Sequence, residues 1–530
     1  MALTLASAAA LLREHHLLRE IIQGDMWTDD ASRIDAADVP FAAITYDTRK
    51  VAEGTLLCCK GRFKAEYLDG IDAKGLQAYM AETDYSSVTR APGLIVNDSR
   101  KAMSLLSAEF YGRPQDELTL IGITGTKGKT TTAYFTQAML GAISGGRAAL
   151  FSSVDNCVDG EHYVESNLTT PESLDLFDLM RQAVDAGMRY LVMEVSSQAY
   201  KKNRVHGVEY DEAAFLNISP DHISPIEHPT FEDYLHCKRQ IVANSHTLVL
   251  GADSDHADLL REDAARAHTP VTTFALHDPA TGHTTPADVA VRPDRTHKTG
   301  IIVTHAGAEE PFVLDMLGEF NFLNAGTAVA LAMKAGVPFD DPAMHAVERV
   351  QVPGRMERFS EGDDLRVYVD FAHNYMSVNA LVDEMMRVYG DRAPRITLVA
   401  GSTGGKAIDR REGIVKGALG RAESFILTLD DPNFEDPRRI AEEMASHVTD
   451  PKAQAKVIVD REEAIATAIA EARASVARDG RFNIVLVVGK GHETRNIIDG
   501  KAVAWPGDAA IVRRELERGR HRIMTDHGVR

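Results

Sequence analysis

One short segment of the chain combines residue types that bind phosphate groups. Residues 122–131 read GITGTKGKTT, and they end the apolar run LTLIGIT and precede a helical pattern. Glycines allow backbone N–H groups to approach a phosphate, Lys129 can reach its terminal oxygens, and the Thr130 hydroxyl can ligate Mg²⁺. Gly122 lies one position earlier than in the usual phosphate loop, so spacing alone leaves a chance glycine-rich turn open. The order of strand, loop and helix favours a phosphate-binding loop.

Further polar groups follow apolar runs that read as strands. Glu194 lies near the end of RYLVMEV, and Asp221 and His222 follow EAAFLNI. Ligands of open parallel sheets bind beyond the carboxyl ends of the strands. Glu194 and His222 are therefore candidate Mg²⁺ ligands beside Thr130, although each alone would be read as a structural or exposed residue. Lys238 lies in the helical segment FEDYLHCKRQIV, where composition alone indicates a solvated surface lysine.

The rhythm of apolar runs predicts the elements that position these groups. The runs LTLIGIT, RYLVMEV and EAAFLNI alternate with helical stretches, and RVYVDFA, RITLVAG, ESFILTL and FNIVLVV repeat the pattern. This alternation predicts an α/β fold with parallel sheets covered on both faces. Breaks at GRPQD and QVPGR indicate three domains. They are an α/β domain at 1–115, a central P-loop domain at 116–350 and a Rossmann-like domain at 351–530.

Composition excludes several classes of protein. The 530 residues include 58 basic and 78 acidic side chains, and the net charge of −20 argues against a nucleic-acid partner. The four cysteines form no CxxC pair, and neighbouring Cys58 and Cys59 predict a buried strand in a protein of the reducing cytoplasm. The N-terminal apolar run reads as an amphipathic helix and not as a signal peptide. No stretch reaches the ~20 apolar residues of a membrane span.

Eight motifs follow one another over almost the whole chain: GITGTKGKTTT, TTPESLD, MEVSSQA, NISPDH, GEFNFLNA, VPGRMERF, DFAH and GKGHE. Together they resemble the Mur ligase family, and within it the MurE type. The resemblance implies an ATP-dependent, Mg²⁺-requiring, ADP-forming amide ligase of cytoplasmic peptidoglycan synthesis. Such an enzyme adds the third amino acid to UDP-N-acetylmuramoyl-L-alanyl-D-glutamate through an acyl-phosphate. The N-terminal domain would bind the UDP-sugar, the central domain ATP, and the C-terminal domain the incoming amino acid.

The resemblance also implies roles for single residues. The catalytic positions are Lys129, Lys238, His222 and Glu194, and Lys238 matches a lysine that CO₂ converts to a carbamate. The metal ligands would be Thr130, Glu194, His222 and the Lys238 carbamate. The ATP-binding positions are Gly125, Thr126, Lys127, Gly128, Lys129, Thr130, Thr131, Asn321, Asn324, Arg355 and Asp370. The UDP-sugar positions are Tyr46, Thr48, Thr169, Thr170, Ser197 and Arg204. Two departures are Gln198, where the family often has His, and DFAHNY in place of DYAHTP.

The incoming amino acid is expected to bind at the sequence DDPN, which ends at Asn433. In the diaminopimelate-adding branch of the family this last position is Arg, which suits a second carboxylate, whereas Asn433 carries no positive charge. Asp430 and Asp431 add negative charge that suits a cationic side chain. L-Lysine is therefore predicted. L-Ornithine, which is one methylene shorter, stays open, since one methylene is worth only about 1–3 kcal/mol in a pocket. The other alternative, meso-diaminopimelate, would need a partner for its second carboxylate.

Two further residues are expected to hold the backbone groups of the amino acid. Arg411 and Glu493 match the positions that bind the α-carboxylate and the α-amine, and Arg410 replaces Arg411 if the register differs by one. The expected partners are small-molecule substrates, namely ATP, the UDP-N-acetylmuramoyl-dipeptide and an amino acid. The protein is expected to be a monomer that binds no nucleic acid and does not insert into a membrane.

Other functions fit the sequence less well. Folylpolyglutamate synthase usually continues its phosphate loop as GKGS and lacks the long N-terminal domain. A mechanical or signalling ATPase would need a water-positioning group and a partner surface. A noncatalytic regulator would be expected to have lost Lys129, Glu194, His222 or Lys238, and all four are present.

Overall fold

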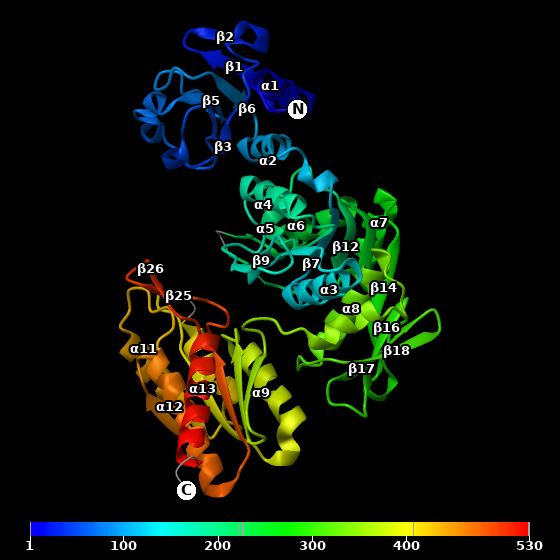
Figure 1. Ribbon diagram of the computed structural model, residues 1–530, viewed down its shortest axis with the longest axis vertical. Coiled ribbons are helices and arrows are strands. Elements are labelled where there is room, and N and C mark those ends of the chain that lie inside the picture. The colour runs from blue at the N-terminus through cyan, green and yellow to red at the C-terminus, as the bar shows by residue number, and fades with distance from the viewer. Residues whose placement is uncertain (1, 222, 225–226, 406–407, 528–530) are drawn as a thin grey trace. The chain divides into compact units, whose positions relative to one another are not determined.

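The computed structural model describes residues 2–221, 223–224, 227–405 and 408–527, and it contains three α/β domains, each built on its own sheet (Figure 1). The chain divides into two compact units. The first comprises Met1–Pro293, Ile302–Phe312 and Phe322–Val347, and the second comprises Asp294–Ile301, Val313–Asn321 and Glu348–Arg530. The domain boundaries after residues 115 and 350 stay predictions.

The N-terminal domain has a six-stranded sheet in the order β2-β1-β6-β5-β4-β3. Strands β3 to β6 run parallel, and β1 pairs antiparallel with β2 and β6. Its elements are α1 (Leu5–Glu14), β1 (Leu18–Gln23), β2 (Met26–Thr28), β3 (Ala43–Thr45), β4 (Thr55–Cys58), β5 (Leu76–Ala81), β6 (Gly93–Val96) and α2 (Ser99–Phe110). Successive residues of an extended chain face opposite sides. Cys58 therefore belongs to the core cluster that includes α1 and α2, and Cys59 to the cluster on the other face. Both cysteines are free and buried, as predicted.

The central domain has a twelve-stranded sheet in the order β10-β9-β8-β11-β7-β12-β13-β14-β16-β17-β18, with β15 paired to β14. Neighbouring strands from β8 to β16 in this order run parallel. The strands are β7 (Thr119–Thr124), β8 (Ala148–Phe151), β9 (Asp155–Cys157), β10 (Tyr163–Glu165), β11 (Tyr190–Glu194), β12 (Tyr210–Phe215), β13 (Ser245–Gly251), β14 (Val271–Asp278), β15 (His283–Thr284), β16 (Val289–Asp294), β17 (Gly300–His305) and β18 (Ala308–Val313). The carboxyl ends of β8, β11, β7 and β12 therefore lie side by side.

Helices cover both faces of this sheet. They are α3 (Lys129–Ser144), α4 (Ser173–Asp185), α5 (Ser197–Lys201), α6 (Phe231–Ala243), α7 (Ala257–Ala267) and α8 (Phe320–Lys334). Residues of α4, α5, α6 and α7 share one core cluster with the sheet, whereas α3 contacts β7, β8 and β11 and adds nothing to that cluster. This layering orients the chain between β7 and α3, which carries the glycine-rich segment.

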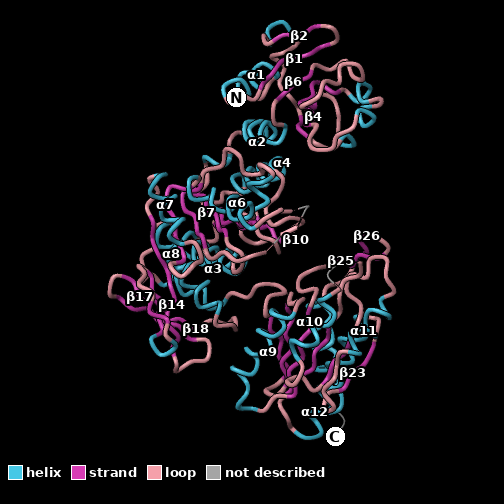
Figure 2. The backbone as a smooth tube through the Cα atoms, turned by 180° about the vertical axis from the view of Figure 1, so that it is seen from behind, coloured by secondary structure: helices cyan, strands magenta, loops and turns pink. Residues whose placement is uncertain are grey.

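The C-terminal domain has six strands in the order β19-β20-β24-β21-β22-β23, and only β19 is antiparallel. They are β19 (Glu357–Glu361), β20 (Leu365–Asp370), β21 (Arg395–Ala400), β22 (Ser424–Leu427), β23 (Gln454–Val457) and β24 (Asn483–Val488), and β25 (Arg495–Ile498) pairs with β26 (Lys501–Ala504) as a separate hairpin. The helices are α9 (Tyr375–Tyr389), α10 (Asp409–Ala418), α11 (Pro437–Ser446), α12 (Arg461–Asp479) and α13 (Asp508–His527). Val367 and Val369 belong to a core with α12 and α13, while Tyr368 belongs to a core with α9, α10 and α11. The strands accordingly lie between helices, which Figure 2 shows from behind.

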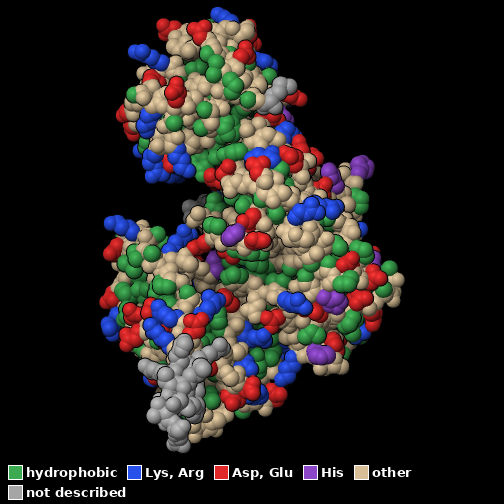
Figure 3. Space-filling view, in the orientation of Figure 1, with side chains coloured by type: hydrophobic (Ala, Val, Ile, Leu, Met, Phe, Trp, Pro, Cys, Tyr) green, Lys and Arg blue, Asp and Glu red, His purple; other side chains and the backbone are tan. Residues whose placement is uncertain are grey.

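The structure confirms the predicted elements and the parallel sheets. LTLIGIT forms β7, RYLVMEV forms β11, EAAFLNI contributes to β12, and FEDYLHCKRQIV forms α6. Among the described residues, no helix combines the length and the apolar character needed to cross a bilayer. Acidic and basic side chains are interspersed over the face seen in Figure 3.

Candidate active site

The glycine-rich segment connects β7 to α3 and requires glycine at defined points. Gly125 and Gly128 have φ angles of 155° and 89°, and a Cβ on Gly128 would lie 2.4 Å from Oδ1 of Asn324. A side chain at either position would be strained. Gly122 has a different role, because a Cβ there would lie 2.7 Å from the ring of Tyr210. Gly122 lies one residue before the usual phosphate-loop glycine because it is required for the packing of β7 against Tyr210.

The side chains of this segment surround its own backbone. The ammonium of Lys129 donates to the carbonyl oxygens of Gly125 and Thr126, at 2.8 and 3.3 Å. Lys127 is exposed and its Nζ lies 3.1 Å from Oδ2 of Asp221, which follows β12. Thr130 and Thr131 open α3 and are buried. The loop thus gathers two ammonium groups and the N-terminus of a helix, which is an arrangement suited to a polyphosphate.

Glu194 lies at the carboxyl end of β11 with its side chain buried. Its Oε1 accepts hydrogen bonds from Oγ1 of Thr130 at 2.9 Å, from the backbone N–H of Ser153 at 2.8 Å and from Oγ of Ser153 at 3.0 Å. Glu194 and Thr130 therefore lie next to each other, as predicted. Carboxylate and hydroxyl oxygens are the donors that Mg²⁺ prefers, so this group fits such an ion. His222 lies outside the described residues.

Lys238 is buried, and the interpretation as a surface lysine is wrong. Its side chain projects from α6, and Nζ donates to the carbonyl oxygen of Gly125 at 2.9 Å and lies 3.5 Å from Oγ1 of Thr124. Burial, with the nearby Lys129 ammonium, lowers the pKa of Lys238 well below its usual range. The ring of Tyr234 lies 5.0 Å from this nitrogen. An amine in this setting is held next to the phosphate loop with little solvent around it.

Several residues expected to bind the nucleotide-sugar gather next to Glu194. Oγ1 of Thr170 donates to the backbone oxygen of Glu194 at 3.0 Å and accepts from the backbone N–H of Ser196 at 3.0 Å. Arg204 donates from Nη1 to the Thr170 backbone oxygen at 3.2 Å. Ser197 opens α5. Thr169 precedes Thr170 in the chain and is half-buried.

A second group involves Tyr46, which follows β3. Its hydroxyl donates to Oδ2 of Asp175 at 2.5 Å, and burial together with Asp175 raises the pKa of Tyr46, which keeps the phenol protonated. The Lys60 ammonium lies 4.1 Å from the Tyr46 ring centre and pairs with Glu172. Glu172 also accepts from Nε of Arg204 at 2.8 Å, so one carboxylate links two cations. Sequence reasoning missed Lys60, although it directly follows the run TLLCC.

The remaining residue from the nucleotide-sugar set is Thr48, which opens the short turn Thr48–Lys50. Its backbone oxygen accepts from Nζ of Lys74 at 3.0 Å. Among the residues that the structure describes, no hydrogen bond or ion pair joins Thr48 to the phosphate loop.

Four further residues were expected to contact ATP. Asn324 lies against Gly128 within the first compact unit, and Asn321 is buried with Nδ2 donating to the Leu317 backbone oxygen at 2.6 Å. Asp370, at the end of β20, accepts from the backbone N–H groups of Met356 and Ala372 at 2.7 and 2.8 Å, and burial raises its pKa. Arg355 lies over the ring of Phe371, 4.6 Å from its centre. Arg355 and Asp370 therefore form a local cluster of their own in the second unit.

The expected amino-acid site lies beyond the carboxyl ends of β22 and β24. Lys490, which sequence reasoning missed although it belongs to the GKGHE motif, is fully buried there. Its Nζ lies 2.9 Å from Oδ1 of Asp431, 2.9 Å from Oε2 of Glu493 and 3.9 Å from Oδ1 of Asp430. Burial raises the pKa of Asp430 and that of Glu493. Three carboxylates thus share one ammonium, so the negative charge predicted for Asp430 and Asp431 is partly neutralised.

Asn433 has the left-handed backbone conformation, with a φ of 56°. Its N–H donates to the Ile497 oxygen at 2.9 Å, and its own backbone oxygen accepts from the N–H of Asp499 at 2.6 Å. The backbone N–H of Ile497 in turn donates to Oδ1 of Asp431 at 2.9 Å. The hairpin of β25 and β26 therefore fixes the backbone of Asn433, the residue from which L-lysine was predicted as the incoming amino acid.

Arg411 is buried on α10 and already has two anionic partners. Nη1 donates to Glu443 at 2.7 Å and Nη2 donates to Glu435 at 2.8 Å, whereas Nε–H has no hydrogen-bond partner among the described residues. Neighbouring Arg410 is half-buried. Of the two arginines, Arg411 is the one whose donors are oriented by fixed partners.

A fully buried ion pair underlies the amino-acid site. Arg461 donates from Nε and Nη2 to both carboxylate oxygens of Asp508, at 2.8 and 2.7 Å. The same guanidinium donates to the backbone oxygens of Leu429 at 3.1 Å and Val488 at 2.9 Å. These oxygens immediately precede Asp430 and the glycine before Lys490, so one side chain fixes the start of both loops.

Comparison with known proteins gives matches over nearly the whole chain. Two family models match: the Mur ligase middle domain over residues 123–332 and the Mur ligase, glutamate ligase domain over residues 354–491. A UDP-N-acetylmuramyl-tripeptide synthetase of Bifidobacterium longum (strain NCC 2705) is 60% identical over 517 residues, which cover 97% of this chain and 99% of that protein. A protein of the same name from Ligilactobacillus salivarius (strain UCC118) is 40% identical over 530 residues, which cover 98% of this chain and 100% of the relative.

Solved structures agree on the fold. A UDP-N-acetylmuramoyl-L-alanyl-D-glutamate–2,6-diaminopimelate ligase has a TM-score of 0.66 and 23% identity, and the match covers 98% of this chain and 100% of that one. A Mycobacterium tuberculosis folylpolyglutamate synthase complexed with ADP has a TM-score of 0.57 and 18% identity, covering 72% of this chain and 90% of that one. At these identities the likeness shows the fold alone.

Proposed function

Because the chain belongs to the Mur ligase family, whose members are ATP-dependent, ADP-forming amide ligases, we propose that it adds L-lysine to UDP-N-acetylmuramoyl-L-alanyl-D-glutamate. The step follows from the name shared by relatives that match the full length of the chain. The observation that carries the chemistry is the meeting of Lys129, Glu194 and Lys238 around the phosphate loop.

The reaction has two steps on these residues. The D-glutamyl carboxylate of the substrate attacks the γ-phosphate of ATP, which yields an acyl-phosphate and ADP. The amine of lysine then attacks the acyl carbon, the amide bond forms, and phosphate leaves. Lys129 offsets the negative charge that develops on the transferred phosphoryl group, and the N–H groups at the start of α3 bind the remaining oxygens.

Mg²⁺ would be held by Glu194 and Thr130, with His222 as a further ligand. When bound, this ion supplies a Lewis acid that stabilises negative charge on phosphoryl oxygens. Ser153 donates two hydrogen bonds to the Glu194 carboxylate, which fixes its orientation. Such outer partners of a ligand keep its oxygen directed at the ion.

We propose that Lys238 acts as a carbamate. Its neutral amine adds to CO₂ and releases one proton, which replaces a potential cation by an anion. This change suits the site because Lys129 and Lys238 donate to the same Gly125 oxygen. Two ammonium groups that both lie within hydrogen-bonding distance of one oxygen repel each other strongly when solvent is excluded. A carbamate in place of one of them removes the repulsion and adds oxygen ligands for a divalent ion.

L-Lysine is favoured over meso-diaminopimelate by the charge of the amino-acid site. Asn433 offers no positive charge to a second carboxylate, and Asp430, Asp431 and Glu493 outnumber the single ammonium of Lys490. A cationic side chain fits that excess of negative charge. We keep Arg411 as the residue for the α-carboxylate, which would then compete with Glu443 and Glu435 for its two terminal nitrogens. L-Ornithine would satisfy the same groups, so the size of the pocket decides between the two amines.

The nucleotide-sugar would be bound by Tyr46, Thr48, Thr169, Thr170, Ser197 and Arg204, and we add Lys60 to this set. Lys60 and Arg204 both pair with Glu172, and two neighbouring cations suit the neutralisation of an anionic diphosphate. ATP would be bound by the phosphate loop with Asn321, Asn324, Arg355 and Asp370. We place the reaction in the cytoplasm, because ATP is required and the four cysteines are free and buried.

ADP release tests the proposal directly. The purified chain is supplied with ATP, Mg²⁺ and UDP-N-acetylmuramoyl-L-alanyl-D-glutamate, and L-lysine, L-ornithine and meso-diaminopimelate are offered separately. Turnover with lysine supports the full proposal. Turnover mainly with diaminopimelate would support an amide ligase but overturn the argument from Asn433 for lysine. No turnover with any of the three amines would overturn the proposal that the chain adds the third amino acid.

A further inference from the structure

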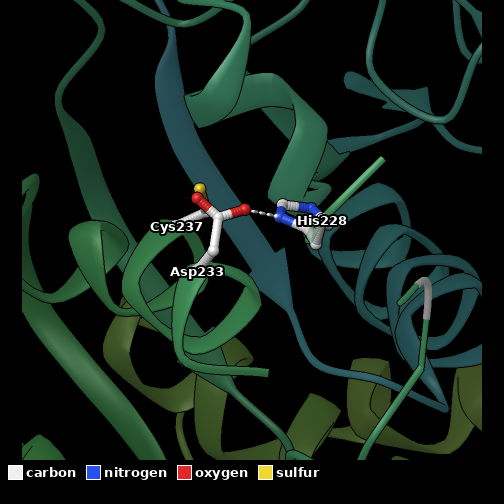
Figure 4. A group of neighbouring side chains, drawn as sticks. All are labelled: His228, Asp233 and Cys237. Atoms are coloured by element: carbon white, nitrogen blue, oxygen red, sulfur yellow. Dashed lines mark hydrogen bonds and ion pairs between the residues drawn. The ribbon is translucent and has the colours of Figure 1, made fainter. Parts of the chain in front are cut away.

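A buried hydrogen-bonded chain links α6 to the start of α5, beside the residues described above. His228 precedes α6 and its side chain is fully buried. Its Nδ1 lies 2.6 Å from Oδ2 of Asp233 and its Nε2 lies 2.9 Å from Oγ of Ser197. Figure 4 shows the Asp233 carboxylate directed at the ring of His228. None of the steps assigned so far uses His228 or Asp233.

The direction of these hydrogen bonds follows from the partners. An ionised carboxylate only accepts, so the proton of the His228 ring lies on Nδ1, toward Asp233. The amide Nε2 of Gln198, which only donates, lies 3.2 Å from Nε2 of His228. With its proton on Nδ1, the ring has one lone pair at Nε2, and the Ser197 hydroxyl at 2.9 Å is the nearer of the two donors. Ser197 consequently donates its hydroxyl proton to His228 and keeps its remaining lone pairs as acceptors.

Cys237 lies close enough to His228 and Asp233 to complete a set of three possible metal ligands. Both ring nitrogens of His228 and the Asp233 carboxylate already have hydrogen-bond partners, and burial raises the pKa of the Cys237 thiol. The same Asp233 oxygen that meets His228 also pairs with the ammonium of Lys201 at 2.6 Å. Lys201 ends α5 and Ser197 begins it, so the cluster holds this helix at both ends.

We propose that His228, held by Asp233, is a positioning residue that fixes Ser197 as a hydrogen-bond acceptor for an N–H group of the nucleotide-sugar's peptide portion. This inference rests on the proposed function and narrows the role of Ser197 within it. A phosphate or carboxylate oxygen only accepts, so it gains no hydrogen bond from a hydroxyl whose proton is already donated. An amide N–H of the muramoyl peptide is the matching chemistry.

The first test is a double-mutant cycle on the Michaelis constants. His228→Ala and Ser197→Ala are each expected to raise KM for UDP-N-acetylmuramoyl-L-alanyl-D-glutamate roughly tenfold, with KM for ATP and lysine within about twofold of the wild type. The double variant is expected to show no further rise, because His228 acts through Ser197. If the two effects multiply, or if KM rises for all three substrates together, His228 has only a structural role and the inference fails.

Two substitutions of His228 test whether the position of the hydrogen-bond acceptor matters, and not merely the volume of the side chain. The amide of His228→Gln reaches the place of Nε2 and can still accept from Ser197, whereas that of His228→Asn reaches only the place of Nδ1. We expect His228→Gln to keep KM for the nucleotide-sugar within about threefold of the wild type and His228→Asn to raise it roughly tenfold. Equal values for the two variants would overturn the inference. Thermal midpoints for both variants report any loss of folding.

UDP, as a competitive inhibitor without a peptide, tests which part of the substrate Ser197 contacts. Its inhibition constant is expected to be unchanged in Ser197→Ala and His228→Ala. A rise that parallels the rise in KM would assign Ser197 to the diphosphate and overturn the inference. Failure of the wild type to turn over the nucleotide-sugar would instead overturn the proposed function, so the two failures are distinct.

Discussion

Lys129 and Lys238 direct their side-chain nitrogens at one backbone oxygen, that of Gly125, from 2.8 and 2.9 Å. They come from different helices, α3 and α6, and Lys238 is fully enclosed. Because the site brings two potential cations to one carbonyl, it favours the conversion of one of the two amines, that of Lys238, into an anionic carbamate. This relationship makes Lys238 the most informative residue to change.

Substitution of Lys238 should abolish turnover while leaving the fold intact. Lys238→Arg keeps a cation but cannot form a carbamate, and Lys238→Ala removes both, so each should lower kcat by at least about a hundredfold. Steady-state ADP release measures this, with Lys456→Arg at the exposed strand β23 as the control. Incubation with ¹³C-bicarbonate should give a carbamate NMR signal in the wild type and in Lys456→Arg, but in neither Lys238 variant. Near-normal kcat in Lys238→Arg would contradict the carbamate.

Glu194→Gln should weaken the dependence on Mg²⁺. The amide keeps the shape of the side chain but loses the negative charge that attracts the ion, so half-maximal activity should require roughly 10–100 times more Mg²⁺. A titration of ADP release against Mg²⁺ measures the shift. Glu262→Gln, an exposed carboxylate on α7, is the matched control. An unchanged Mg²⁺ requirement in Glu194→Gln would remove Glu194 from the metal site.

Asn433→Arg should shift selectivity toward meso-diaminopimelate. The guanidinium can pair with the second carboxylate of that substrate, and the ratio of kcat/KM for diaminopimelate to that for lysine should rise at least about tenfold. Asn tolerates the left-handed conformation better than most residues, which incur a cost of about 1–2 kcal/mol there. Asn433→Ala carries this strain without the charge and is the control. Equal shifts in both variants would show that strain, and not charge, sets the ratio.

Arg461→Met should destabilise the C-terminal domain by about 3–5 kcal/mol, because it leaves Asp508 buried without its partner. The double variant Arg461→Met, Asp508→Leu should recover much of that loss, since no unpaired charge remains. Urea unfolding of the full chain measures the free energy of unfolding. Additive losses in the double variant would mean that packing, and not the buried charge, determines the effect.

The strands and the phosphate loop were predictable because their signals are local. β7 reads as one apolar run, and Gly125 and Gly128 mark the loop that follows it. Lys238 was not predictable as a buried residue, because its helix also carries exposed polar side chains, and only contact with Gly125 shows which face is enclosed. Ser153 was missed for a related reason: it meets Glu194 from a different strand end, 41 positions away.

The amino-acid site shows a second limit of sequence reasoning. Asp431 reads as negative charge available to a substrate, yet its carboxylate bonds to Lys490 and to the backbone of Ile497. Lys490 lies 59 positions away. The charge of a site depends on which groups the fold brings together, and no pattern within DDPN reports the ammonium that arrives from another strand.

Arg461 also has a consequence for how this pocket can change. Its guanidinium bonds to the backbone oxygens of Leu429 and Val488, which any residue supplies, so the spacing of the two loops does not depend on their side chains. The Arg461 guanidinium can therefore hold the start of each loop while substitutions within the loops change the charge of the pocket. The anchoring of the two loops and the charge of the pocket therefore depend on different groups: the Arg461 guanidinium provides the first, and the loop side chains provide the second.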